Sequence, residues 1–178
     1  MSAPTTPFAH ILVPIDFATA TDDQIAAGHA IQVDGQYIDY APASQRALEL
    51  AAGIARLSGG QVLLLHVTPQ LNYSPIYTGA ALSGEVISEV HRAARDSSIR
   101  ALQALAQRIC PDVQAHFEAR PGVALYAIIE EAEKNQIDLI VLAASGRSRV
   151  ARFFVGSTAD RVIRQAPCPV MVIPAIAH

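Results

Sequence analysis

The chain has 178 residues, of which 51% are hydrophobic and 16% are charged. This length and composition are enough to bury a core, and we expect a single domain over residues 1–178. The formal net charge of -3 supplies no broad cationic field, which argues against nucleic acid as a partner. The N-terminal residues lack a signal-peptide pattern and no apolar run is long enough to span a bilayer, so we expect a cytoplasmic protein.

Short apolar runs alternate with helical patterns along the chain, which is typical of βαβ units laid into a parallel sheet. Most of these runs are almost continuously apolar, as strands buried on both faces should be. The expected strands are residues 11–16, 62–67, 113–118, 138–143 and 170–173. The third is polar enough for a sheet edge. We therefore predict an α/β fold, a single doubly wound, open five-stranded parallel sheet flanked by helices.

Helical periodicity predicts helices between these strands, over residues 44–58, 83–109, 122–134 and 157–166. Gly59-Gly60 ends the first helix, and Pro167 stops the last. The longest helix has an apolar register formed by Ile87, Val90, Ala94, Ala101 and Leu105. Cys110 and Cys168 match no metal or redox spacing and are interpreted as packing residues.

Residues 18–41 do not fit the alternation and are interpreted as an insertion between the first strand and the first helix. Within it, residues 29–33 and 36–40 flank Asp34-Gly35, a dipeptide that suits a type I′ turn. The insertion is therefore predicted to be a β-hairpin. A disordered loop is the alternative.

Pairing across the hairpin turn places Ile31, Val33, Ile38 and Tyr40 on one face. A two-stranded hairpin is only marginally stable until such a face is covered. Both ends of the insertion should stand at the rim of the site described next, so the hairpin either closes over that site as a lid or docks on a neighbouring subunit. We favour the neighbouring subunit, where the hairpin would reinforce a dimer or build a higher oligomer.

In open α/β sheets, ligands bind beyond the carboxyl ends of the strands, where the winding reverses. The loop after the fourth strand contains Gly146, three arginines and Gly156, and it leads into a helix N-terminus. Backbone N–H groups beside glycines, together with the helix dipole, suit a phosphate. The first and fourth strand ends are therefore the expected binding site.

Gly146, nine intervening residues and Gly156-Ser157 match most of the G-x2-G-x9-G-[ST] loop of the universal stress protein family. The family's first glycine is replaced by Ala143. The resemblance extends to four further segments and leaves out only the insertion. These segments are residues 11–17, 64–67, 137–141 and 166–173. The chain is thus similar to this family over most of its length.

The resemblance implies a site for ATP or another adenine nucleotide, optionally with Mg²⁺. Asp16 looks like the family's adenine-contacting aspartate, and Val67 like the apolar wall beside the base. The residues expected to bind nucleotide are Pro14, Ile15, Asp16, Val67, Leu142, Ala143, Ser145, Gly146, Arg147, Gly156, Ser157 and Thr158. No metal ligand and no catalytic residue is expected.

Several of these residues also have a purely structural interpretation. Ser157 and Asp160 have the spacing of a capping box, and Asp16 is suited to hydrogen-bond the next loop. The arginines of the loop are interpreted as solvated surface except Arg147, and His66 as a core histidine rather than a catalyst. Lys134 is the only lysine and lies at a helix end, which excludes a P-loop NTPase.

The leading hypothesis is a dimeric stress-response module that binds an adenine nucleotide and is not an enzyme, apart from slow incidental ATP hydrolysis. The alternative is a protein interaction module of the same fold whose site stays empty, which Ala143 favours. A homodimer is expected through the apolar strand from Val170 to Ile173, because a bare apolar edge invites pairing. The resemblance implies the same dimer.

Overall fold

The computed structural model describes residues 7–68, 84–144 and 156–174, and its centre is a five-stranded parallel sheet. The strand order is β6-β5-β1-β7-β8, with every neighbouring pair parallel. The strands are β1 (His10–Pro14), β5 (Gln61–Thr68), β6 (Ala115–Pro121), β7 (Leu139–Ala143) and β8 (Val170–Ile173). The predicted fold class is confirmed, with the polar strand β6 at one edge and β8 at the other.

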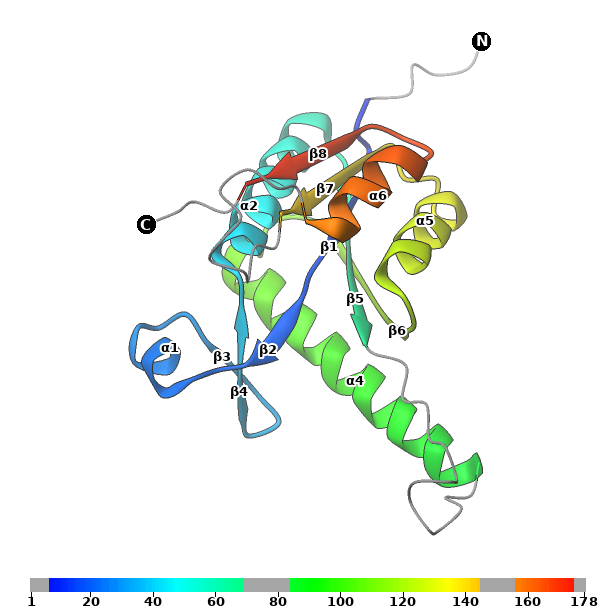
Figure 1. The fold of residues 1–178 in the computed structure, drawn as a ribbon. Coiled ribbons are helices and arrows are strands. Elements are labelled where there is room, and N and C mark those ends of the chain that lie inside the picture. The colour runs from blue at the N-terminus through cyan, green and yellow to red at the C-terminus, as the bar shows by residue number, and fades with distance from the viewer. Residues whose placement is uncertain (1–6, 69–83, 145–155, 175–178) are drawn as a thin grey trace.

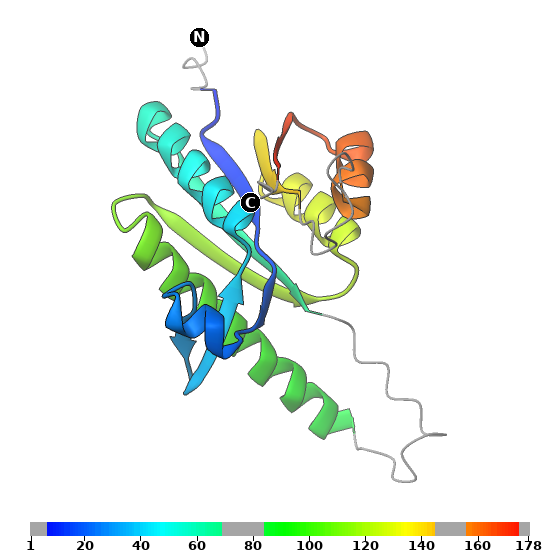
Figure 2. The same ribbon diagram turned by 60° about the vertical axis from the view of Figure 1, so that its left-hand side comes forward.

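Helices cover both faces of the sheet (Figures 1 and 2). They are α2 (Pro42–Ser58), α4 (Gly84–Ile109), α5 (Ala124–Lys134) and α6 (Ser157–Gln165). One hydrophobic cluster joins α2 and α4 to the sheet, and a second joins α5 and α6 to the other face. Gly59 ends α2 in the left-handed conformation, with φ 66°, as a C-cap glycine does. No helix in the described part of the chain has the length and apolar character to cross a membrane.

The longest helix, α4, is buried only along its second half. Ala101, Leu102, Leu105 and Ala106 are buried, whereas Val90, which the sequence register assigned to the packed face, is 39% exposed. The first half of α4 extends past the sheet in Figure 1. The predicted register is therefore correct for the second half of the helix and wrong at Val90.

The insertion forms a second, three-stranded antiparallel sheet with the order β2-β4-β3. Its elements are β2 (Phe17–Thr19), α1 (Asp22–Ala26), β3 (Ile31–Val33) and β4 (Gln36–Tyr40). The hairpin prediction is confirmed, because β3 and β4 pair around Asp34 and Gly35, whose φ values of 52° and 78° are positive as a type I′ turn requires. The strand β2 and the helix α1 were not predicted.

The apolar face of the hairpin packs within the same chain. Ile31, Val33 and Tyr40 are buried and belong to the hydrophobic cluster that contains α2 and α4. The turn is fastened to α4 as well, because Asp34 accepts hydrogen bonds from Arg100 Nη2 at 2.7 Å and Ser97 Oγ at 3.0 Å. The expectation that this face covers the nucleotide site or a neighbouring subunit is wrong, since α4 provides the missing cover.

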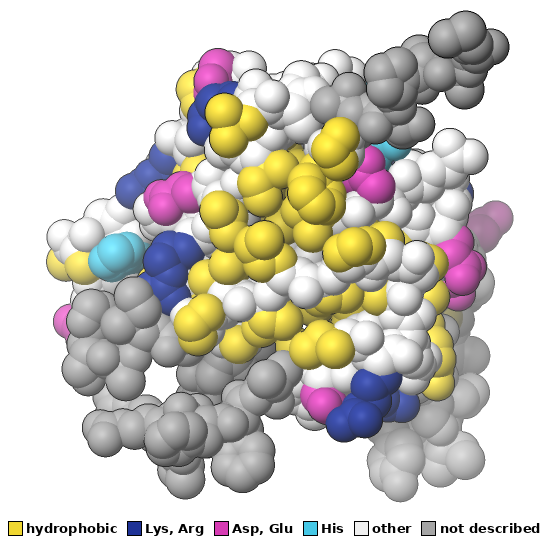
Figure 3. Space-filling view, turned by 90° about the horizontal axis from the view of Figure 1, so that it is seen from above, with side chains coloured by type: hydrophobic (Ala, Val, Ile, Leu, Met, Phe, Trp, Pro, Cys, Tyr) yellow, Lys and Arg dark blue, Asp and Glu magenta, His cyan; other side chains and the backbone are white. Residues whose placement is uncertain are grey.

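A hydrophobic surface lies on the side of the molecule where β8 forms the sheet edge (Figure 3). Met171 on β8 is 38% exposed, and the helices that contact β8 expose Leu50 on α2 and Ile163 on α6. Monomeric proteins rarely expose contiguous apolar surface of large area, so this edge is suited to an interface.

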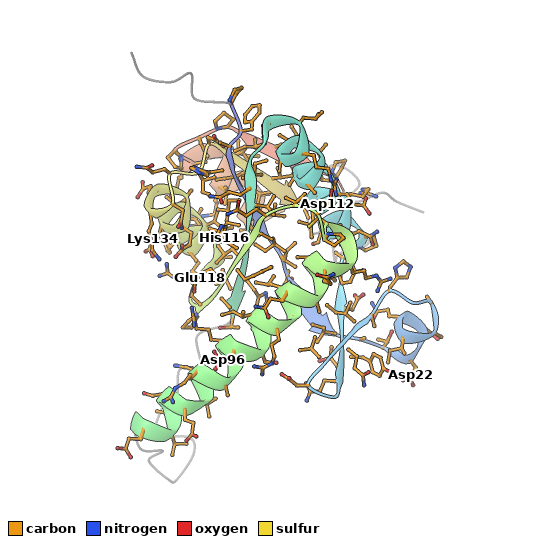
Figure 4. All side chains as sticks on the ribbon, turned by 180° about the vertical axis from the view of Figure 1, so that it is seen from behind. Asp22, Asp96, Asp112, His116, Glu118 and Lys134 are labelled. Atoms are coloured by element: carbon orange, nitrogen blue, oxygen red, sulfur yellow. The ribbon has the colours of Figure 1, made fainter. Side chains whose placement is uncertain are left out.

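An ion pair connects α2 with the turn between α4 and β6. Arg56 Nε lies 2.6 Å from Asp112 Oδ2, and the hydrogen bond from Arg56 lowers the pKa of Asp112 from 3.8 to about 2. Figure 4 labels Asp112 beside the C-terminal end of α4. Because the folded-state pKa is lowered, the pair contributes stability above pH 3.8 and loses it as the pH falls through about 2.

We predict that the Asp112 carboxyl titrates near pH 2 when followed by its ¹³C chemical shift. Arg56→Gln removes the charged donor and should return the midpoint toward 3.8. Arg164→Gln, which removes a guanidinium paired with Asp160 on α6, is the control and should leave the midpoint unchanged. A wild-type midpoint near 3.8 would show that this pair does not form in solution.

Candidate functional site

A cavity of about 230 Å³ lies at the carboxyl ends of the central strands. Its apolar wall comes from β5, α5 and β7, and includes Val67, Ile128 and Leu142. The complete lining is Pro14, Ile15, Asp16, Ser44, Leu65, Val67, Ala124, Ile128, Leu142, Ala143, Thr158 and Ala159. Pockets for drug-sized ligands usually enclose about 300–1,000 Å³. The described residues thus enclose room for part of a nucleotide, such as its base.

The polar groups of the cavity come from three different elements. Asp16 follows β1, Ser44 lies in the first turn of α2 and Thr158 in the first turn of α6. Neither helix has a side-chain cap, because the N-cap residues are Ala41 and Gly156. Two helix N-termini, with the positive ends of their dipoles, therefore meet the cavity together with one carboxylate and two hydroxyl groups.

The capping-box interpretation of Ser157 and Asp160 is wrong. The helix begins at Ser157, so this residue is past the N-cap position that a capping box requires. The Asp160 carboxylate instead pairs with Arg164, 3.1 Å away on the same helix. The start of α6 is left with backbone N–H groups that no side chain of the helix caps, which suits an anion.

Residues of β5 contact the chain on both sides of Asp16. Ile15 donates its N–H to the Leu65 carbonyl at 2.8 Å, and the Ile15 carbonyl lies 2.8 Å from His66 Nδ1. His66 is 8% exposed, and its ring centroid is 5.0 Å from that of Phe17. The interpretation of His66 as a satisfied core histidine is confirmed.

The structure brings seven of the twelve predicted residues into the lining of this cavity: Pro14, Ile15, Asp16, Val67, Leu142, Ala143 and Thr158. Gly156 and Ser157 lie beside them at the start of α6. Ser145, Gly146 and Arg147 lie outside the described residues. The predicted residues that are described therefore gather at one place.

Five lining residues were missed from the sequence: Ser44, Leu65, Ala124, Ile128 and Ala159. Four of them are helical, and their pattern in the sequence is that of core-facing helix positions. Ser44 had a usable signal, because it is a small polar residue at the beginning of a helix that starts at the carboxyl edge of the sheet.

A second cavity, of about 140 Å³, lies at the opposite end of the sheet. It is lined by His10, Ile11, Gln61, Leu63, His116, Asn135 and Ile137. Figure 4 shows His116 on β6, with Glu118 two residues further along the strand. In the described part of the chain, no group of three His, Cys, Asp or Glu residues could hold a metal ion.

The comparisons with known proteins agree on one family. A family model described as the universal stress protein family matches residues 37–174. The chain is 32% identical to universal stress protein MJ0531 of Methanocaldococcus jannaschii over 137 residues, which are 76% of this chain and 77% of that protein. The model match begins inside the insertion, at Tyr37 on β4.

Solved structures have the same fold. Universal stress protein UspA from Lactobacillus plantarum superposes with a TM-score of 0.61 and 27% identity, covering 94% of this chain and 98% of that one. A universal stress protein family protein from Arabidopsis thaliana, with AMP bound, superposes with a TM-score of 0.56 and 20% identity, covering 95% and 93%. At that identity the likeness concerns the fold alone.

Proposed function

Because this chain belongs to the universal stress protein family, we propose that it binds an adenine nucleotide in the cavity at the carboxyl ends of β1, β5 and β7. The observation that carries the proposal is one cavity joining Asp16, the apolar wall at Val67 and Thr158 at an uncapped helix N-terminus. The AMP bound to the Arabidopsis relative supports the choice of an adenine nucleotide.

Each part of the cavity has a chemical role in this proposal. The Asp16 carboxylate and neighbouring strand-end backbone accept hydrogen bonds from the exocyclic amine of the base. Val67, Ile128 and Leu142 contact the ring faces, which removes apolar surface from water. The first turn of α6 donates backbone N–H groups and the Thr158 hydroxyl toward the phosphates.

We propose a binding module rather than an enzyme. The described lining residues supply one carboxylate, two hydroxyl groups and no histidine. Since the proposal assigns the carboxylate of Asp16 to the adenine base, no other carboxylate or imidazole among them is left to activate a nucleophile. A nucleotide that binds one conformation of the protein better than another shifts the population toward it, which is the basis for a sensor.

Thr158→Glu tests the site without endangering the fold. A carboxylate in the first turn of α6 interacts favourably with the helix dipole, yet it fills the cavity and repels phosphate. We expect ATP affinity to fall at least about tenfold by isothermal titration calorimetry, a loss of about 1.4 kcal/mol. Gln103→Glu, the same charge change on an exposed position of α4, should leave the affinity unchanged.

One outcome would contradict nucleotide binding itself, and another would contradict the location of the site. If wild-type protein shows neither heat nor thermal shift with millimolar ATP, the nucleotide function is wrong. If ATP binds equally well to wild type and Thr158→Glu, the nucleotide lies elsewhere.

The second candidate function is an interaction module whose site stays empty, and Ala143 is the observation that favours it. The Ala143 side chain lines the cavity where the family loop has its first glycine, so its methyl group occupies space that a ribose or phosphate could use.

Ala143→Gly separates the two candidates. If the methyl group blocks the site, this variant should acquire ATP binding that the wild type lacks, measured by calorimetry and by thermal shift. If the wild type already binds ATP, removing the methyl group should change the affinity by less than about threefold, or about 0.7 kcal/mol. No binding by either protein would leave the interaction module as the better candidate.

We further propose a homodimer through β8. Hydrogen bonds from Ile140 N to Pro169 O and from Ala144 N to Ile173 O fix the pairing of β8 with β7. In a parallel pair, only every second residue of a strand directs its N–H and C=O groups toward a given neighbour. The N–H and C=O groups of Val170 and Val172 therefore point away from β7. Two antiparallel copies of β8 can exchange these bonds about a two-fold axis at Met171, which closes the exposed edge.

Val172→Pro tests this register. Proline removes one outward N–H and none of the bonds to β7, and it is tolerated on edge strands. We expect wild type at twice the chain mass of 18.9 kDa by light scattering after gel filtration, and the variant at the chain mass. Gln114→Ala, directly before β6 at the opposite edge of the sheet, is the control and should leave the mass at the wild-type value. A monomeric wild type at tens of micromolar would contradict the dimer.

A further inference from the structure

The insertion leaves the main fold at the cavity and rejoins it there. Asp16 lies directly before β2, and Ser44 lies in the first turn of the helix that follows β4. Both residues line the cavity. The insertion therefore connects two of the three polar groups of the site, although its apolar face packs on α4.

The two ends of the insertion are paired with each other. Phe17 is opposite Tyr40, and Ala18 is opposite Asp39, in the antiparallel pairing of β2 with β4. Tyr40 is 2% exposed and belongs to the core, which fixes this base of the insertion. The pairing holds the strand after Asp16 against the strand that leads to Ser44.

His66 contacts the chain on both sides of Asp16. Its Nδ1 atom lies 2.8 Å from the carbonyl oxygen of Ile15, and its ring is tilted at 47° to the ring of Phe17 with centroids 5.0 Å apart. A carbonyl oxygen only accepts, so Nδ1 carries the proton of this hydrogen bond. Since His66 is buried and lies on β5, one imidazole fixes the residues before and after Asp16 from the neighbouring strand.

We infer that His66 is a positioning residue of the binding site, and that with the Phe17–Tyr40 pair it holds Asp16 in the orientation that receives the ligand. The inference rests on the proposed function, because the ligand is the adenine nucleotide placed in this cavity. His66 does not line the cavity, so it acts through Ile15 and Phe17. The insertion then serves to order the site instead of covering it.

The test compares His66→Leu with His66→Asn. Leucine removes the donor to Ile15, whereas the side-chain amide of asparagine offers an N–H donor from a similar position. We expect His66→Leu to bind ATP about tenfold more weakly and to exchange the amide hydrogens of Asp16 and Phe17 faster in the nucleotide-free protein. His66→Asn should restore both quantities to within about threefold of wild type.

Val62→Ala is the matched control. Val62 is fully buried near the amino end of β5, at the other end of the strand from Val67, and does not line the cavity. Its truncation destabilises the fold, yet ATP affinity and exchange at Asp16 should stay at wild-type values. Equal effects of Val62→Ala and His66→Leu would mean that general destabilisation explains the loss, which would overturn the inference.

Nucleotide binding and the positioning role of His66 are tested by different outcomes. If wild type binds no ATP, the proposed function is wrong, and hydrogen exchange in the nucleotide-free variants still tests the positioning role. If ATP binds, and His66→Leu changes neither affinity nor exchange, the positioning role is wrong and the function stands. Should His66→Leu not fold, Phe17→Leu removes the ring contact alone, and unchanged exchange at Asp16 in that variant would likewise contradict the inference.

Discussion

Burial of the central strand β1 on both faces is the constraint on which the rest of the structure depends. Ile11, Leu12 and Val13 are fully buried; Ile11 and Val13 belong to the cluster with α2 and α4, and Leu12 to the cluster with α5 and α6. A strand covered on both sides needs a helix layer on each face, and parallel strands need crossovers to supply those layers. Because parallel strands all end at one edge, Asp16 and Ala143 meet at one cavity.

The sequence predicts those strands, turns and site residues that depend on a local pattern. Apolar runs determine the strands, and the Asp34-Gly35 turn determines the hairpin and its register. Asp16 and Thr158 could be placed because they adjoin a strand end and a helix start. Ser44 and Ile128 could not, because a helical residue lines a cavity only through the way its helix packs on the sheet.

The packing of the insertion on α4 could not be predicted from the sequence, for a related reason. Arg100 and Arg108 look like exposed charges on a long helix, but Arg100 pairs with Asp34, and Arg108 Nη2 donates to the Gly28 carbonyl at 2.7 Å. These contacts join residues far apart in the chain, so no local sequence pattern predicts them. They make α4 the support of the insertion, and the base of the insertion lies beside Asp16 and Ser44.

The most direct test of the account is a titration of ¹⁵N-labelled protein with ATP, followed by amide chemical shifts. Binding in the cavity at the carboxyl ends of the strands predicts that the largest changes fall on Asp16, Ser44, Val67, Thr158 and Ala159. Changes centred instead on His10, Gln61 and His116, around the cavity at the opposite end of the sheet, would contradict it, as would a spectrum that ATP leaves unchanged.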